Sequence, residues 1–126
     1  MPTHIHHGSY RHREGYKGAL ALLQEGVTAL IAGDSMMTAG ALEACHNAGK
    51  RIGEEIALVG FDDFIYLRFQ PSPISVVDQG VARMGETATA KLIAAINEKH
   101  QPEGEVLETR YIPRMSTAHQ LDGATP

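Results

Sequence analysis

A chain of 126 residues is long enough for one modest domain with a real hydrophobic core. Its composition, 43% hydrophobic and 21% charged, is typical of a soluble globular protein, and no stretch approaches the roughly 18 apolar residues of a membrane helix. The net charge of −4, with basic residues only in scattered pairs, argues against direct binding of nucleic acid. The single cysteine excludes an intrachain disulfide, and the first residues lack the basic start and apolar core of a secretory signal. We therefore expect a cytoplasmic protein that does not enter a membrane.

Hydrophobic periodicity predicts an alternation of helices and short strands. In chain order, the expected elements are a helix over 13–25 capped by Gly26, a strand over 27–32, a helix over 35–48, a strand over 56–61, an irregular aromatic segment over 64–73, a strand over 74–77, a helix over 80–98 and an antiparallel or edge strand over 105–112. Residues 3–7 form either one strand or an irregular terminus, a turn follows at 8–10, and the tail after Thr117 is expected to fray. This order predicts an α/β fold with a parallel sheet flanked by helices.

Carboxylates follow two of the predicted strands. The run 56–61 is apolar at nearly every position, as in a strand buried on both faces, and it ends in Asp62 and Asp63. The strand over 27–32 ends in Gly-Asp, which places Asp34 at the corresponding point. Ligands of open α/β sheets bind beyond the carboxyl ends of the strands. Two such strands side by side would therefore present their carboxylates to a small polar molecule.

Several motifs, collinear over nearly the whole chain, resemble regulators of the lactose/galactose-repressor (LacI/GalR) family. They are Leu58-Val59-Gly60-Phe61-Asp62-Asp63 followed by Pro71-Ser72-Pro73-Ile74-Ser75-Val76-Val77-Asp78-Gln79, the loop and helix start Ala32-Gly33-Asp34-Ser35-Met36-Met37-Thr38-Ala39-Gly40-Ala41-Leu42, the closing Arg114-Met115-Ser116-Thr117, and Gly8-Ser9-Tyr10 with Glu14-Gly15-Tyr16. Three positions depart from the family pattern. Gly53 stands where proline is usual, Asp34 where asparagine is frequent, and Ile74-Ser75-Val76 replaces Leu-Thr-Thr.

The resemblance implies that residues 1–126 are part of a periplasmic-binding-protein-like (type I) effector-binding domain, mainly its C-terminal lobe in truncated form. Residues 80–117 would be the crossover helix and the return strand. A small-molecule effector, a sugar or a related metabolite, would control DNA binding by a helix-turn-helix headpiece that lies outside this chain. The resemblance also implies that the helix 35–48 and the loop 66–73 contribute to dimerisation.

The helix over 80–98 carries an apolar stripe whose partner in the family is the N-terminal lobe. Burying four or five of its large side chains would be worth on the order of 8 kcal/mol, which is too much to leave in water. We therefore expect a homo-oligomer, either a dimer or copies that exchange this helix.

Four residues are predicted to bind the effector. The resemblance implies that Asp62 accepts hydrogen bonds from the ligand, that Tyr10 stacks on it and that Gln79 reaches it with an amide able to donate and accept. Asp34 ends the neighbouring strand, although capping the helix 35–48 is its alternative role, and ordinary partial burial is the alternative for Tyr10. Asp63 is expected to cap a turn or to be solvated.

Neither catalysis nor a cofactor is predicted. The histidines His4, His6, His7 and His12 fit a solvent-facing strand edge better than a metal site, because no carboxylate or thiol is placed to complete one. Cys45 and His46 are adjacent in a helix, so their side chains do not face each other. Two rivals stay open: a sugar-binding protein of a transport system with the same fold, and an α/β enzyme such as a phosphotransferase or isomerase that uses Asp34 and Asp62.

Overall fold

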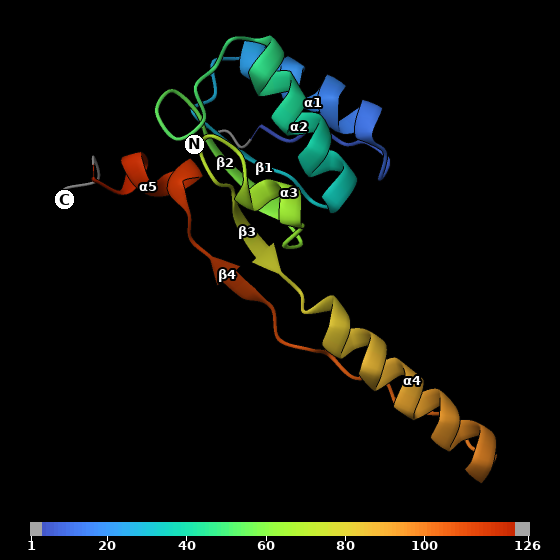
Figure 1. The fold of residues 1–126 in the computed structure, drawn as a ribbon. Coiled ribbons are helices and arrows are strands. Elements are labelled where there is room, and N and C mark those ends of the chain that lie inside the picture. Colours follow the sequence, from blue (N-terminus) through green and yellow to red (C-terminus); the bar gives the residue numbers. More distant parts are fainter. Residues whose placement is uncertain (1–3, 123–126) are drawn as a thin grey trace.

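The structure, a computed structural model, describes the backbone of residues 4–122 and the side chains of residues 4–118. Its elements in chain order are α1 (His12–Gln24), β1 (Ala29–Ile31), α2 (Ser35–Asn47), β2 (Ala57–Phe61), α3 (Ile65–Arg68), β3 (Ser75–Asp78), α4 (Val81–Glu98), β4 (Arg110–Ile112) and α5 (Met115–Asp122). The predicted alternation of helix and strand is confirmed, and Figure 1 shows α1 and α2 packed together beside the sheet, with α4 pointing away from it.

The four strands form one mixed sheet in the order β1-β2-β3-β4. β1, β2 and β3 run parallel, and β4 closes the far edge antiparallel to β3, as the edge-strand prediction anticipated. The core lies against the middle strands, where Leu58, Ile74 and Val76 are fully buried. The outer edge of β1 is open, and Ile31 is 80% exposed although it lies in an apolar run. The α/β prediction is therefore correct, and β1 is an edge strand of the sheet.

α1 and α2 lie side by side because glycines let their backbones meet (Figure 1). A Cβ atom on Gly40 would lie 2.2 Å from the carbonyl oxygen of His12. One on Gly15 would lie 2.6 Å from the Cα atom of Met37. Side chains at these positions would push the helices apart, so the glycines fix where α2 begins and thus where Asp34 lies.

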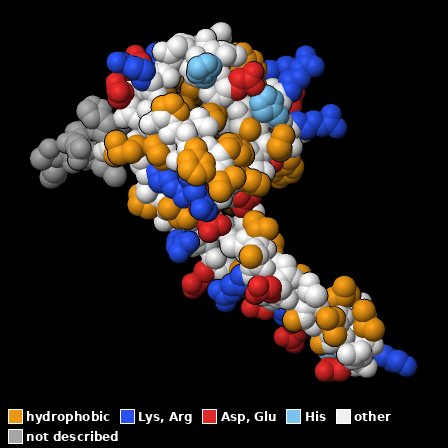
Figure 2. Space-filling view, in the orientation of Figure 1, with side chains coloured by type: hydrophobic (Ala, Val, Ile, Leu, Met, Phe, Trp, Pro, Cys, Tyr) orange, Lys and Arg blue, Asp and Glu red, His pale blue; other side chains and the backbone are white. Residues whose placement is uncertain are grey.

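α4 projects from the sheet as a long arm (Figure 1). None of the residues Val81–Glu98, all of which the structure describes, is buried. The chain returns along α4, and Lys91 Nζ holds this return segment through the carbonyl oxygen of Glu103 at 3.1 Å and Oε2 of Glu105 at 3.3 Å. Apolar side chains gather toward the tip of the arm in Figure 2. The arm therefore leaves an apolar surface in water.

Three local expectations need correction, and the alternative left open for the N-terminal residues is decided. The segment 64–73 contains the short helix α3, and the tail after Thr117 continues as α5 to Asp122 instead of fraying. The predicted strand over 105–112 shrinks to its last three residues because β3 ends at Asp78, which pairs with Arg110. Residues 4–7 form no strand, while residues 1–3 and 123–126 lie outside the described part of the chain.

In the part of the chain that the structure describes, no helix combines the length and the apolar character needed to cross a membrane.

Candidate ligand site at the carboxyl ends of β1 and β2

Thr38 joins the ends of the two acid-tipped strands. Its hydroxyl accepts a hydrogen bond from the Phe61 N–H at 3.0 Å and donates one to the Asp34 carbonyl oxygen at 2.6 Å. The side chain is fully buried, and it packs so closely on Gly60 that a Cβ atom there would lie 2.5 Å from the threonine methyl group. Because β1 and β2 are parallel neighbours, this bridge holds both carboxyl ends at one edge of the sheet.

Asp34 caps α2. Its carboxylate Oδ1 accepts a hydrogen bond from the Met37 N–H at 2.6 Å, and its backbone is extended, as expected for an N-cap residue. The capping role that the sequence offered as an alternative is therefore present. It occupies one carboxylate oxygen, and ligand binding by Asp34 stays a prediction.

Asp62 follows β2 in a backbone conformation that is uncommon for residues other than glycine. Its φ angle is 63°, and its N–H donates a hydrogen bond to the Val77 carbonyl oxygen of β3 at 2.9 Å. Its carboxylate Oδ1 is buried and has no hydrogen-bond partner among the described residues. A buried acceptor without a partner costs free energy, about 1–3 kcal/mol, which a donor on a ligand would recover.

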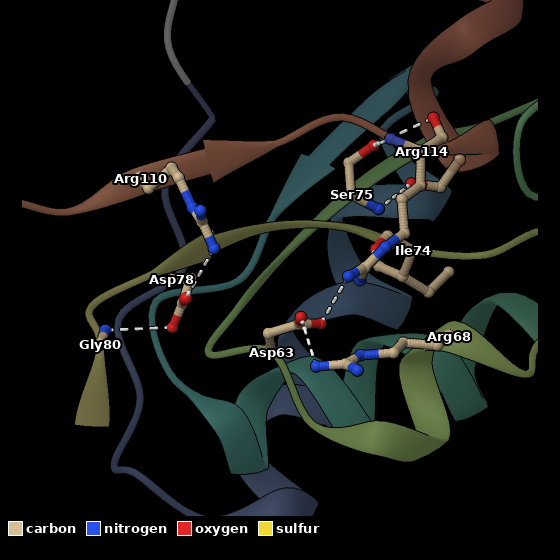
Figure 3. A network of polar contacts seen from close by, with 9 residues as sticks. Asp63, Arg68, Ile74, Ser75, Asp78, Gly80, Arg110 and Arg114 are labelled. Carbon is tan, nitrogen blue, oxygen red and sulfur yellow. Dashed lines mark hydrogen bonds and ion pairs between the residues drawn. The ribbon is translucent and has the colours of Figure 1, made fainter. Parts of the chain in front are cut away.

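Asp63 is neither a cap nor solvated, which corrects the expectation for it. Its side chain is 12% exposed, and it forms ion pairs with Arg68 at 2.8 Å and Arg114 at 2.7 Å (Figure 3). The Arg114 contact joins opposite charges rather than a well-aligned hydrogen bond. Burial of the carboxyl opposes ionisation, but the two arginines outweigh it and hold the pKa of Asp63 below its usual value.

The lowered pKa predicts how Asp63 affects stability as the pH changes. Its ionised carboxylate stabilises the fold at every pH above its unfolded-state pKa of about 4, and this contribution is lost as the pH falls through the lower folded-state pKa. The free energy of unfolding of Asp63→Asn should therefore differ from that of the wild type most at neutral pH, and the difference should shrink below about pH 4. Urea denaturation across this range measures it, with Glu54→Gln on the exposed surface as control. A difference that does not vary with pH would contradict the prediction.

The other two predicted site residues lie in different surroundings. Gln79 is half-buried and directly follows β3, beside the β2 end that carries Asp62. Tyr10 is 78% exposed on the segment before α1, and no ring contact or hydrogen bond among residues 4–118 joins it to the other three. The structure therefore places Asp34, Asp62 and Gln79 after three neighbouring strands, at one end of the sheet. Tyr10 lies just before α1, and its contact with a ligand stays a prediction.

Sequence reasoning missed the residues that hold the C-terminal segment of the chain against β2 and the start of β3. The Ser116 hydroxyl donates to the Leu58 carbonyl oxygen at 2.6 Å and accepts from the Ser75 N–H at 2.7 Å, and both serines are fully buried. The Arg114 guanidinium also donates to the Ile74 carbonyl oxygen at 2.9 Å (Figure 3). The closing Arg-Met-Ser-Thr motif was the available signal, but it carried no structural role until the strands were in place.

The histidines have individual partners. His4 contacts Glu25, and His12 lies 2.8 Å from Glu43. His4, His6 and His7 are exposed, but they do not belong to a strand edge as expected. Within residues 4–118, no group of three or more metal-binding side chains is close enough to hold an ion. Burial raises the pKa of the Cys45 thiol to about 11, so this group stays protonated at neutral pH.

Residues 3–117 match the family model of the periplasmic binding protein-like domain. The chain belongs to this family. It is 30% identical over 115 residues to the HTH-type transcriptional regulator MalR of Streptomyces coelicolor, covering 90% of this chain and 33% of that protein. The HTH-type transcriptional repressor MelR of Bacillus subtilis is 31% identical over 119 residues, 92% of this chain and 34% of that protein.

Solved structures give the same assignment. A probable LacI family transcriptional regulator from Corynebacterium glutamicum superposes with a TM-score of 0.73 at 37% identity, covering 87% of this chain and 39% of that one. The transcriptional regulator CelR in complex with cellobiose has a TM-score of 0.77 at 28% identity, covering 86% and 34%. The LacI-family resemblance is thus confirmed, and the chain spans about a third of the length of the curated relatives it matches.

Proposed function

We propose that this chain is the effector-sensing part of a bacterial transcriptional regulator. A small polar molecule, a sugar or a related metabolite, binds at the carboxyl ends of β1, β2 and β3. In the intact regulator, the bound molecule shifts the population of lobe arrangements and so the DNA affinity of a helix-turn-helix headpiece. Residues 80–117 serve as crossover helix and return strand to the other lobe. The protein acts in the cytoplasm and catalyses no reaction.

One observation carries this proposal. The Oδ1 atom of Asp62 is buried at a strand end without a hydrogen-bond partner among the described residues. A carboxylate in this position can accept charge-assisted hydrogen bonds from sugar hydroxyls, which are stronger than those between neutral groups. The family supports the ligand class, since the related CelR was solved in complex with cellobiose. Against an enzyme that uses both carboxylates, Oδ1 of Asp34 is already engaged as a helix cap.

The test replaces Asp62. Titration of the isotopically labelled chain with cellobiose and with lactose, followed by amide chemical shifts, should show weak binding centred on Asp62 and Gln79. Weak binding is expected because the chain supplies one side of the cleft. Asp62→Asn should weaken binding at least about tenfold, since it removes a charged acceptor worth roughly 1.5–3 kcal/mol.

The matched control is Glu54→Gln, which also replaces a carboxylate by an amide, but on the exposed surface. It should bind as the wild type does. Equal affinity of Asp62→Asn and the wild type would contradict the role of Asp62. A folded wild type that binds neither sugar would contradict the choice of these sugars as ligands.

We also propose that two copies associate through the arm. On α4, Leu92 is 59% and Ile96 66% exposed, and no element of the body covers them. Light scattering at rising concentration should show a dimer that Leu92→Lys weakens. Ala90→Lys, an equal charge on an exposed position of the same helix, should leave the dimer intact. A wild type that stays monomeric at high concentration would rule this association out.

A further inference from the structure

Asp62 is held in its conformation from both sides. Its own N–H donates a hydrogen bond to the Val77 carbonyl oxygen of β3 at 2.9 Å, which holds the backbone nitrogen of Asp62 in place. The next residue, Asp63, is fixed by its side chain, which is paired with Arg68 and Arg114. A left-handed φ is less favourable for aspartate than for glycine, so contacts on either side of the residue stabilise it. Here the peptide between Asp62 and Asp63 is anchored at each end.

Arg114 is itself immobilised by contacts independent of Asp63. Its guanidinium donates to the Ile74 carbonyl oxygen at 2.9 Å, and its backbone N–H donates to the Ser75 hydroxyl at 2.8 Å. The same hydroxyl donates back to the Arg114 carbonyl oxygen at 3.1 Å. Figure 3 shows the guanidinium reaching from the segment after β4 to Asp63. Arg114, which pairs with Asp63, is therefore held against the start of β3 by contacts of its own.

Arg68 makes a weaker second contact. It belongs to α3, and its side chain is 51% exposed, whereas that of Arg114 is 16% exposed. Because exposed ion pairs contribute little, Arg114 should supply most of the restraint on Asp63.

We propose that Asp63 is a positioning residue for ligand binding: its pairing with Arg114 keeps Asp62 left-handed and so keeps the Asp62 carboxylate directed into the ligand site. Asp63 itself does not touch the ligand. This inference rests on the proposed ligand role of Asp62, but the conformation of Asp62 can be measured without any ligand.

The experiment measures two quantities on the labelled 126-residue chain. The first is the three-bond coupling between the α proton of Asp62 and the carbonyl carbon of the preceding residue, which is large at a left-handed φ and small at negative φ. The second is the affinity for cellobiose or lactose. In Asp63→Asn, the coupling should move from its left-handed value toward a conformational average. If only a tenth of molecules then keep the binding conformation, the affinity falls about tenfold.

Three further variants separate positioning from general stability. Arg114→Lys keeps the positive charge, but a lysine cannot contact both Asp63 and the Ile74 carbonyl oxygen, so the coupling of Asp62 should be intermediate. If Asp63→Asn does not fold, Arg114→Lys is the variant that tests the proposal. Ser116→Ala loosens the same C-terminal segment without touching Asp63 and should leave the coupling unchanged, as should Glu55→Gln, which breaks an exposed ion pair with Arg51.

An unchanged Asp62 coupling in Asp63→Asn, or in Arg114→Lys if the former is unfolded, overturns the proposal. So does an equal shift in Ser116→Ala, because Asp63 would then act only through stability. If the wild type binds neither sugar, the proposed ligand class fails while the coupling still decides the role of Asp63.

Discussion

Gly40→Ala should destabilise the protein by about 3 kcal/mol, at the upper end of the usual cost of overpacking a core. The added methyl group would lie 2.2 Å from the His12 carbonyl oxygen and 2.5 Å from the Tyr16 backbone nitrogen. Both neighbours are main-chain atoms, so no side-chain rotation relieves the clash and α1 must move away from α2. Urea denaturation measures the loss as a lower midpoint with an unchanged slope.

Gly85→Ala is the matched control, since Gly85 is also a glycine inside a helix. A Cβ atom there meets no atom within 4 Å. Because alanine favours helix over glycine, this change should stabilise α4 by roughly 0.5–1 kcal/mol where it has any effect. If both variants unfold at the wild-type midpoint, the close contact between α1 and α2 is not what holds these helices.

Ser116→Ala should cost about 3 kcal/mol, because one buried hydroxyl serves two main-chain groups. Its loss removes the hydrogen bonds to the Leu58 carbonyl oxygen and from the Ser75 N–H, which lie 2.6 and 2.7 Å away. The Ser75 N–H would then be buried without this acceptor. Thermal or urea unfolding measures the change.

Ser35→Ala provides the comparison for this substitution. Ser35 is the first residue of α2, and alanine is well tolerated in a helix. It should change stability by less than about 0.5 kcal/mol, as substitutions away from such networks do. A loss in Ser116→Ala no larger than in Ser35→Ala would mean that water replaces the lost hydroxyl.

Local sequence signals correctly predicted the elements whose boundaries are set by residues close to them in the sequence. The apolar spacing in α1 and the glycine that follows it, Gly26 at φ 81°, are both set within a few residues. The failures occur where distant residues decide. β4 is short because its partner β3 ends at Asp78, and α5 begins where Ser116 bonds to β2 and β3. No local pattern contains these pairings.

The candidate site divides in the same way. Parallel neighbouring strands make it predictable that Asp34 and Asp62 share an edge, and this adjacency is confirmed. Thr38 was not predictable as the bridge, because its contact with Phe61 spans 23 positions of sequence. The pairing of Asp63 with Arg114 was not predictable either. Asp62 and Asp63 are adjacent and identical in the sequence, and only the fold brings an arginine to one of them.

The exposed arm has a consequence for how the molecule opens. A helix that packs on no core can separate or unwind without disturbing the rest, so its local opening requires far less free energy than global unfolding. In the dilute monomer, amide protons of Val81–Glu98 should therefore exchange with deuterated water long before those of Ala57–Phe61. Trypsin should cut first after Arg83, Lys91 or Lys99, leaving the sheet and its two packed helices as the resistant product.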